Sequence, residues 1–269
     1  MQGASRSALA ESREVLSQVL GQDTDRGRLG EELLQVARVI DGNAVLRRTL
    51  ADPTREGSDK SDLVGRLFAG RVSDATQKVA ATVASRRWAS EVDLVSTLEE
   101  FGIESILAQA ESSGRLGQVE DELFRFGRIV DGTSELRSAL TDRRASTEAK
   151  SRVVRDLLAD RSAPETVRLA ELAATHRRTR FDHAVAAYLK IAARRQEQLT
   201  ATVTTAVSLT EQQLERLTAA LSKHYDRDVH VNQVVDPKVV GGIRVEIGDE
   251  VIDGTILSRL DEARRRLTS

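Results

Sequence analysis

An internal repeat is the feature that most limits how this chain can fold. The segment RVIDGNAVLRRTLAD starts at Arg38, and RIVDGTSELRSALTD starts at Arg128, 90 positions later. The same offset, without gaps, aligns further identical residues: Asp41/Asp131, Gly42/Gly132, Leu46/Leu136, Arg47/Arg137, Leu50/Leu140, Asp52/Asp142, Lys60/Lys150, Val64/Val154, Leu67/Leu157, Thr76/Thr166 and Arg87/Arg177. A constant offset over such a span indicates a duplicated unit. The shared positions are mainly leucines, turn residues and arginines, which indicates a common packing scheme rather than a shared active site.

The region before residue 200 is predicted to be almost entirely helical. Its apolar residues mostly recur at spacings of three and four, and its only prolines are Pro53 and Pro164. The expected helices of the first copy are an opening helix over 4–11 and 13–20, then 29–40, 44–50, 60–69, 74–85 and about 90–111. Those of the second copy are 119–130, 134–140, 147–160, 164–175 and 181–199. We expect the helix over 90–111 to close the first bundle and open the second.

After residue 200 the pattern becomes mixed. In ATVTTAVSL, the residues Val203, Val207 and Leu209 mark a first strand. Thr210 and Gln213 form a capping box, in which the two side chains satisfy amide groups at the start of a helix. The apolar stripe of that helix consists of Leu214, Leu217, Leu221 and Tyr225.

Further strands follow this helix, because apolar and polar residues then alternate. The apolar positions are Val229, Val231 and Val235, followed by Ile243, Val245 and Ile247. Asp236-Pro237 ends the earlier strand, since proline has no amide donor, and Gly241-Gly242 allows the chain to re-enter the sheet. A turn at 248–250 leads to a short edge strand over 251–252. Asp253-Gly254 ends this strand, and a final amphipathic helix follows.

Taken together, these patterns predict a mostly α fold: two tandem N-terminal helical bundles followed by a small C-terminal α/β domain. The expected boundaries are 1–105 for the first bundle, 106–199 for the duplicated bundle and 200–269 for the α/β domain. A small mixed sheet covered by two helices is expected in the last of these.

Composition excludes several classes of function. The formal net charge is -2 and aromatic residues make up 3%, so neither a basic surface nor a stacking platform for nucleic acid is expected. The chain has no cysteine, which excludes disulfides and thiolate metal sites and fits a reducing cytoplasm. No apolar run approaches the roughly 20 residues that cross a bilayer, so we expect a soluble chain without direct membrane insertion.

The search for catalytic chemistry yields no site. The histidines His176, His183, His224 and His230 lack the spacing and acidic partner of a zinc site, and surface or capping roles are favoured for them. VVGGIR lacks the lysine and hydroxyl of a phosphate-binding loop and is better explained as a glycine bulge. The Asp-Gly pairs at 41 and 131 are interpreted as helix ends rather than metal loops. We therefore expect no catalytic, cofactor-binding or metal-binding residues.

One run carries a family resemblance. VDPKVVGGIRVEIGDEVIDGTILSRLDEARRRL resembles the C-terminal signature of the delta subunit of F-type ATP synthases, the bacterial counterpart of the oligomycin-sensitivity-conferring protein. That family has one helical bundle before its α/β domain, so this chain has one bundle extra, as in actinobacterial synthases. The resemblance implies a non-catalytic stator subunit of the proton-translocating enzyme, active in ATP synthesis and ion transport.

The same resemblance implies partners and site residues. In the family, a helical bundle holds the N-terminal helix of an alpha subunit, and the C-terminal domain binds the b subunits of the peripheral stalk. Peripheral attachment to the cytoplasmic face of the cell membrane follows. The residues that would shape the b-facing surface are Asp236, Pro237, Gly241, Gly242, Asp253, Gly254, Ile256 and Leu260.

Two alternatives remain open at this point. A generic helical adaptor, unrelated to ATP synthase, would show no preference for the synthase head. An RNA-binding protein would use the α/β domain and nearby arginines, and would show salt-dependent binding to RNA. Which of the two bundles holds the alpha-subunit helix is also undecided.

Overall fold

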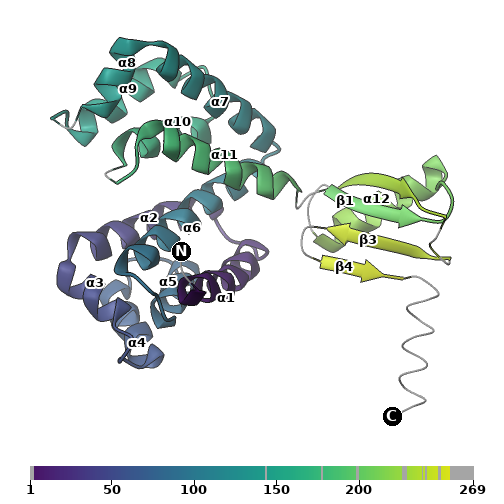
Figure 1. Ribbon diagram of the computed structural model, residues 1–269, viewed down its shortest axis with the longest axis horizontal. Helices are drawn as coiled ribbons and strands as arrows, with labels where there is room; N and C mark the ends of the chain where they lie inside the picture. The colour runs from purple at the N-terminus through teal and green to yellow at the C-terminus, as the bar shows by residue number, and fades with distance from the viewer. Residues whose placement is uncertain are drawn as a thin grey trace. The chain divides into compact units, whose positions relative to one another are not determined.

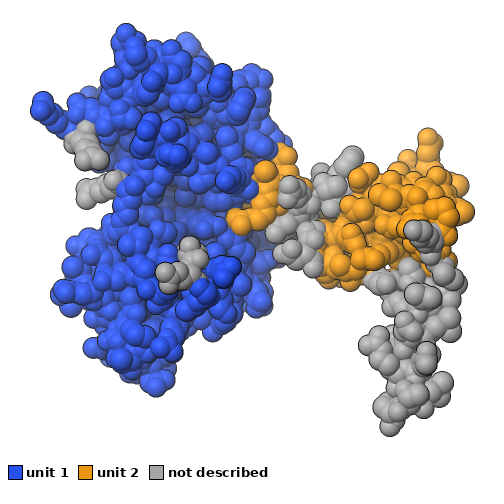
Figure 2. All heavy atoms as spheres, viewed as in Figure 1, with its two compact units in different colours: residues 1–192 blue, residues 193–269 orange. Residues whose placement is uncertain are grey.

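The structure is a computed structural model, and it describes residues 3–142, 144–176, 178–197, 200–225, 229–237, 239, 241–247 and 250–254. The chain divides into two compact units, residues 1–192 and residues 193–269, coloured separately in Figure 2. The first is helical and the second contains the sheet (Figure 1). The predicted fold class is confirmed. The predicted boundaries at 105 and 199 stay predictions.

Helices of the first copy begin close to the predicted residues. Their bounds are α1 Gly3–Leu20, α2 Arg26–Gly42, α3 Ala44–Ala51, α4 Gly57–Phe68, α5 Asp74–Ser85 and α6 Glu91–Ser112. The second copy continues with α7 Leu116–Gly132, α8 Ser134–Thr141, α9 Thr147–Leu158, α10 Pro164–Thr175 and α11 Phe181–Glu197. Each of α7, α8, α9 and α10 begins and ends 90 residues after its counterpart in the first copy. The repeat in the sequence is therefore a repeat of structure.

The helix α6 belongs to both bundles, as predicted. Leu94, Leu98 and Phe101 in its first half are buried in the core formed with α1 to α5. Ile106 and Leu107, further along, are buried in the core formed with α7 to α11. Because one continuous helix supplies side chains to both cores, the two bundles share a structural element rather than a flexible linker.

Many of the repeated polar residues form the same contacts in both copies. Arg47 and Arg137 each donate a hydrogen bond to the backbone carbonyl of the aspartate that precedes the helix-ending glycine, Asp41 or Asp131. The Asp-Gly pairs thus end α2 and α7, as predicted. The turns after α4 and α9 also correspond, since Gly70 and Asp160 both have a left-handed backbone, with φ of 67° and 63°.

The second unit consists of β1 Thr200–Thr205, α12 Glu211–Tyr225, β2 His230–Val235, β3 Ile243–Ile247 and β4 Glu250–Asp253. The strand order is β2-β1-β3-β4, with β1 parallel to β2 and antiparallel to β3, and with β3 antiparallel to β4. The mixed sheet is as predicted. Side chains that alternate along β1 and β3 form the core with α12: Ala201, Val203, Leu221, Val229, Val245 and Ile247.

The first strand is shorter than predicted. It ends at Thr205, whose Oγ1 donates to the backbone carbonyl of Val207 at 2.7 Å and turns the chain away from the sheet. Val207 is 72% exposed, whereas Leu209 packs against the core from outside the strand. The predicted capping box is present, because Gln213 Oε1 accepts from the amide of Thr210 at 2.9 Å. The predicted final helix lies outside the described residues.

Candidate functional site

The signature residues after β2 form a tight connection into β3. The amide of Asp236 donates to the carbonyl of Thr205 at 2.9 Å, which extends the β1–β2 pairing by one bond before Pro237. Gly241 and Gly242 then adopt φ of 64° and 87°, a conformation that side-chain-bearing residues rarely adopt. The predicted glycine re-entry is confirmed. Its effect is that β3 enters the sheet antiparallel to β1.

The last signature residues lie at the edge of the sheet. The amide of Gly254 donates to the carbonyl of Ile243 at 2.9 Å, and a Cβ at this position would lie 3.1 Å from that oxygen. Asp253 pairs with Arg244 in the register of β3 and β4. Val251 and Ile252 on the edge strand are 52% and 41% exposed. Ile256 and Leu260 lie outside the described residues.

A single tyrosine ties the helix of this unit to the edge strand. The Tyr225 hydroxyl at the end of α12 donates to Oε2 of Glu250 at 2.8 Å. Burial, followed by this hydrogen bond and the negative charge of Glu250, raises the pKa of Tyr225 to about 12. The hydroxyl therefore stays a neutral donor at physiological pH, and it fixes the beginning of β4 against the helix.

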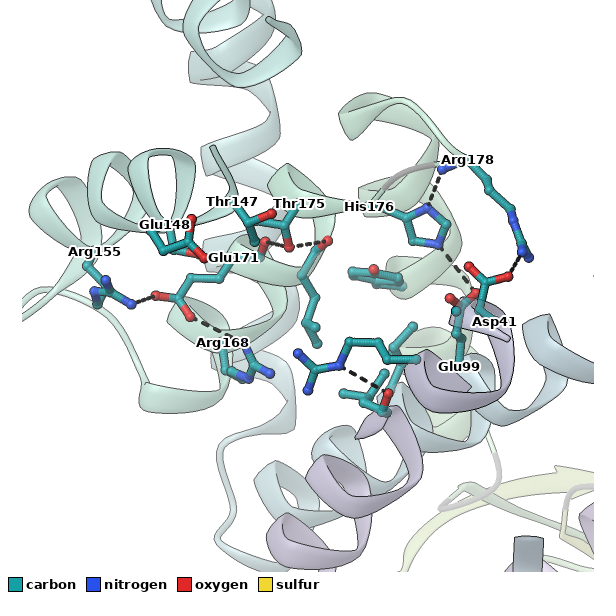
Figure 3. A pocket seen from close by; sticks show the side chains of 17 residues that line it. Asp41, Glu99, Thr147, Glu148, Arg155, Arg168, Glu171, Thr175, His176 and Arg178 are labelled. Carbon is teal, nitrogen blue, oxygen red and sulfur yellow. Dashed lines mark hydrogen bonds and ion pairs between the residues drawn. The ribbon is translucent and has the colours of Figure 1, made fainter. Parts of the chain in front are cut away.

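A hollow with a volume of about 640 Å³ lies within the helical unit (Figure 3). It separates α2 and α6 of the first copy from α9, α10 and α11 of the second. Its lining residues are Leu34, Arg38, Asp41, Gly42, Glu99, Ile103, Thr147, Glu148, Ser151, Arg155, Arg168, Glu171, Leu172, Thr175, His176, Arg178 and Tyr188. We call this space the inter-bundle cleft.

Charged groups in the inter-bundle cleft largely neutralise one another. Glu171 lies between two guanidinium groups, at 2.7 Å from Nη1 of Arg155 and 3.3 Å from Nη1 of Arg168, as Figure 3 shows. Arg168 also donates to both carboxylate oxygens of Glu31 on α2, at 2.5 and 2.7 Å. This bidentate hydrogen bond is the main reason that the pKa of Arg168 is raised.

Two further pairs cross the cleft at its other end. Arg178 is bonded to Asp41, and Nε2 of His176 lies 3.5 Å from Oε2 of Glu99 (Figure 3). Nδ1 of His176 accepts from the backbone amides of Arg178 and Thr179 at 3.2 and 3.1 Å, so this histidine holds the turn that follows α10. The surface or capping roles expected of the histidines stay predictions. The chemistry of the cleft is therefore that of a joint, in which charged side chains of two bundles bind each other.

The sequence offers no signal for this joint. Glu31 and Arg168 are 137 residues apart, and neither stands out from the many charged residues of the helices. Within the described ranges, no group of three or more His, Cys, Asp or Glu side chains is arranged to hold a metal ion. In the same ranges, no helix is both long and apolar enough to span a bilayer.

Comparisons with known proteins now decide the family. Residues 104–267 match the family model described as ATP synthase delta (OSCP) subunit. The chain belongs to the ATP synthase delta (OSCP) family. An ATP synthase subunit delta from Kineococcus radiotolerans is 43% identical over 98% of this chain and 97% of its own length. Another from Streptomyces coelicolor is 46% identical over 100% of this chain and 99% of its own.

These relatives extend over both helical bundles, whereas the family model covers only the second. The match to the family model begins at Glu104, inside α6, and so corresponds to the second bundle and the sheet unit. The delta subunits of Kineococcus and Streptomyces match this chain from end to end, which confirms the predicted actinobacterial form with an extra bundle. A chain of the Toxoplasma gondii mitochondrial ATP synthase hexamer matches 63% of this chain and 97% of its own, at 16% identity and a TM-score of 0.34.

Proposed function

We propose that the chain is a non-catalytic subunit of the peripheral stalk of an F-type ATP synthase, where it joins the alpha/beta head to the b subunits. The observation that carries this proposal is end-to-end similarity to curated delta subunits, at 43% identity over 98% of the chain. Proton flow turns the rotor, and the resulting torque would spin the head unless a linker held it. This function places the chain peripherally, on the cytoplasmic face of the cell membrane.

A linker of this kind works by stiffness and slow dissociation rather than by reaction. The shared helix α6 supports this mechanism, because force applied to one bundle passes directly into the core of the other. The pairing of Glu31 with Arg168 supports it too, since these groups bind each other across the joint. Contacts with partners would need low off-rates, because a linker that dissociates during a turn uncouples proton flow from synthesis.

The alpha-subunit contact is proposed as a helix in a groove of the helical unit. Such grooves bind the apolar face of an amphipathic helix through residues one turn apart. The resemblance supplies this partner, and the end-to-end similarity to curated delta subunits supports it. Both bundles have an apolar core to which α6 contributes, so each offers a packed platform for such a helix.

The b-subunit contact is proposed at the edge strand β4 and the segment that follows it. Val251 and Ile252 are the exposed apolar side chains of that strand. Ile256 and Leu260 would extend the surface beyond the described residues. The remaining signature residues would shape this surface from beneath by fixing the connection and the strand end: Asp236, Pro237, Gly241, Gly242, Asp253 and Gly254.

Binding measurements with the full chain test both contacts. The probes are a synthetic peptide of the cognate alpha-subunit N-terminus and the purified b subunits. The double variant Val251→Ser, Ile252→Ser should weaken b binding about tenfold, which corresponds to about 1.4 kcal/mol, and should leave alpha-peptide binding unchanged. Val207→Ser is the matched control, because Val207 is also exposed in this unit but lies outside the edge strand. Failure to bind the peptide, the b subunits and the assembled head would overturn the proposal and leave the generic adaptor.

A further inference from the structure

A single imidazole holds the turn that follows α10. Nδ1 of His176 accepts hydrogen bonds from the backbone amides of Arg178 and Thr179, at 3.2 and 3.1 Å. A ring nitrogen that accepts carries no proton, so the ring is neutral in this arrangement and its one N–H is on Nε2. Nε2 faces α6, where it lies 3.5 Å from Oε2 of Glu99 (Figure 3). The contacts of His176 therefore select one neutral tautomer.

The same turn carries an arginine that connects the two bundles. Arg178 lies two residues after His176, and its guanidinium is bonded to Asp41 near the C-terminal end of α2 (Figure 3). His176 thus faces the shared helix α6 with one ring nitrogen and holds, with the other, the backbone from which Arg178 reaches the first bundle.

The first copy holds the equivalent turn without a group that changes charge near neutral pH. The positions of His176 and Arg178 are occupied there by Arg86 and Trp88. Trp88 is buried, and its indole Nε1 donates to the backbone carbonyl of Val83 at 2.8 Å. An indole nitrogen is a donor only, and an arginine stays charged in proteins. The two copies therefore share a fold but differ in how this turn responds to acid.

Protonation of His176 is incompatible with the turn that it holds. In the imidazolium both ring nitrogens are donors, so Nδ1–H would face two backbone amides that also donate. The turn then loses both hydrogen bonds, while the positive charge gains Glu99 as a partner on the other side of the ring. The proton comes from solvent, which reaches this side chain because it is 20% exposed. Acid therefore replaces the hydrogen bonds of the turn with an ion pair to α6.

His176 is the group in the inter-bundle cleft that is suited to change charge near neutral pH. Histidine is the one side chain whose ordinary titration lies between about pH 5 and 8, and no other histidine is among the described lining residues of the cleft. Burial raises the pKa of Tyr188 on α11 well above its usual range, so that hydroxyl stays neutral. The other charged lining residues come from each element around the cleft: Arg38 and Asp41 on α2, Glu99 on α6, Glu148 and Arg155 on α9, Arg168 and Glu171 on α10, and Arg178 on the turn.

We propose that His176 is a pH-sensitive switch in the joint between the two bundles. The neutral ring holds the turn from which Arg178 binds Asp41, and the protonated ring releases that turn and pairs with Glu99. After release, the bond of Arg178 to Asp41 loses its fixed backbone, and the second bundle is held less firmly against α2. The switch operates within one chain and does not rest on the proposed function. In a stalk linker, its consequence is a joint that becomes more compliant as the pH falls.

Amide hydrogen exchange of Arg178 and Thr179, followed by NMR between about pH 8 and about pH 5, tests the proposal. After correction for the intrinsic pH dependence of exchange, the protection of both amides should fall at least about fivefold as His176 protonates, since each loses its hydrogen bond. The imidazole nitrogen resonances of His176 report protonation in the same samples. Unchanged protection while the ring protonates would overturn the inference, and so would a ring that stays neutral throughout.

Two substitutions separate the roles of the ring nitrogens. His176→Asn keeps an acceptor at the place of Nδ1, because an asparagine side chain accepts from the amide two residues on and does not titrate, so the turn should stay protected at every pH. His176→Gln lacks that acceptor and should leave the turn unprotected at every pH. His183→Asn is the matched control, since His183 is exposed on α11 outside the cleft, and it should follow the unaltered chain. Protection that still falls with pH in His176→Asn would contradict the switch.

Spin labels measure whether the joint responds. The chain has no cysteine, so Ser58→Cys on α4 and Arg152→Cys on α9, both at exposed positions, place one label on each bundle. The distribution of distances between the labels should broaden between about pH 8 and about pH 5, and should stay narrow when His176→Asn is added. Trp88 fluorescence should remain native throughout, because the first bundle keeps its own turn. Equal distributions at both pH values would overturn this inference and leave the proposed function standing.

Discussion

Glu32 and Glu122 occupy equivalent positions and cap the same helix in each copy. Glu32 accepts from the amide and hydroxyl of Ser73 at 2.8 and 2.6 Å and from the hydroxyl of Thr76 at 2.7 Å, at the start of α5. Glu122 accepts from Ala163 and Thr166 in the same way at the start of α10. A carboxylate at a helix N-terminus satisfies free amides and opposes the helix dipole.

Replacement of this carboxylate should destabilise one bundle at a time. We expect Glu32→Gln to lower the free energy of unfolding of the first bundle by about 2 kcal/mol, because charge-assisted bonds are lost and a donor amide faces other donors. Trp88, the only tryptophan, is buried in the first core, so its fluorescence during urea unfolding reports on that bundle. Glu14→Gln, an exposed carboxylate on α1, is the control and should stay within about 0.5 kcal/mol. Equal midpoints for Glu32→Gln and the unaltered chain would contradict the prediction.

The same carboxylate predicts a pH dependence. Burial raises the pKa of Glu32, but hydrogen bonds from Ser73, Thr76 and Arg28 outweigh this effect and lower the pKa from 4.5 to about 2. Because the folded-state pKa is the lower one, the stabilisation is complete above about pH 4.5 and is lost as the pH falls toward about 2. The Trp88 unfolding midpoint should therefore fall less steeply in this window for Glu32→Gln than for the unaltered chain. Parallel curves would show that the carboxylate does not titrate as described.

At the scale of elements, the crossing of α2 and α6 depends on two glycines. A Cβ on Gly30 would lie 2.8 Å from the carbonyl of Gly102 and from Cγ1 of Ile106. A Cβ on Gly102 would lie 2.7 Å from Cγ of Leu34. The helices therefore approach each other closely enough that any side chain at either position must push them apart.

Alanine at these glycines should destabilise the first bundle, although alanine has a higher helix propensity than glycine. Alanine favours a helix by about 1 kcal/mol over glycine, yet we expect Gly30→Ala to destabilise the first bundle by about 1 to 3 kcal/mol, since overpacking shifts the backbone. Gly65→Ala in α4 is the control, because its Cβ would meet only Gln77 Nε2, at 3.6 Å, and it should stabilise. Trp88 fluorescence during urea unfolding measures both. If Gly30→Ala stabilised the first bundle, the α2–α6 crossing would have space for an added methyl group.

The sequence predicts the individual helices and strands well, but it does not predict which of them pack against each other. Helix ends at Gly42 and Gly132 follow from the repeated Asp-Gly pairs, and the end of β2 follows from Asp236-Pro237. Apolar periodicity also identifies inward faces. It fails for Leu34 and Phe124, which have equivalent positions and similar character but opposite exposure. Their difference arises from which bundle lies next to each helix, and local pattern contains no information on that.

At the scale of the whole molecule, the described contacts show how the two bundles of the helical unit are held together. The shared helix α6 supplies a covalent connection with buried side chains on both sides. The ion pair of Glu31 with Arg168 adds a contact whose side chains are 39% and 31% exposed. Pairs this exposed contribute at most about 1 kcal/mol. The stiffness required of a linker under torque therefore resides mainly in α6, and the pairs across the cleft contribute to how the second bundle is oriented about it.

Charge reversal at this pair separates the two contributions. We expect Glu31→Arg or Arg168→Glu alone to raise amide hydrogen exchange in α10 about two- to fivefold, the equivalent of about 0.5 to 1 kcal/mol, while Trp88 fluorescence stays native because α6 still fills the first core. The double reversal should restore the exchange rates, since it rebuilds the pair with opposite polarity. Arg152→Glu, exposed on α9, is the control for a change in net charge. If the double reversal exchanges as fast as the faster single variant, Glu31 and Arg168 do not act on each other, and the orientation of the bundles must come from α6 and the other pairs across the cleft.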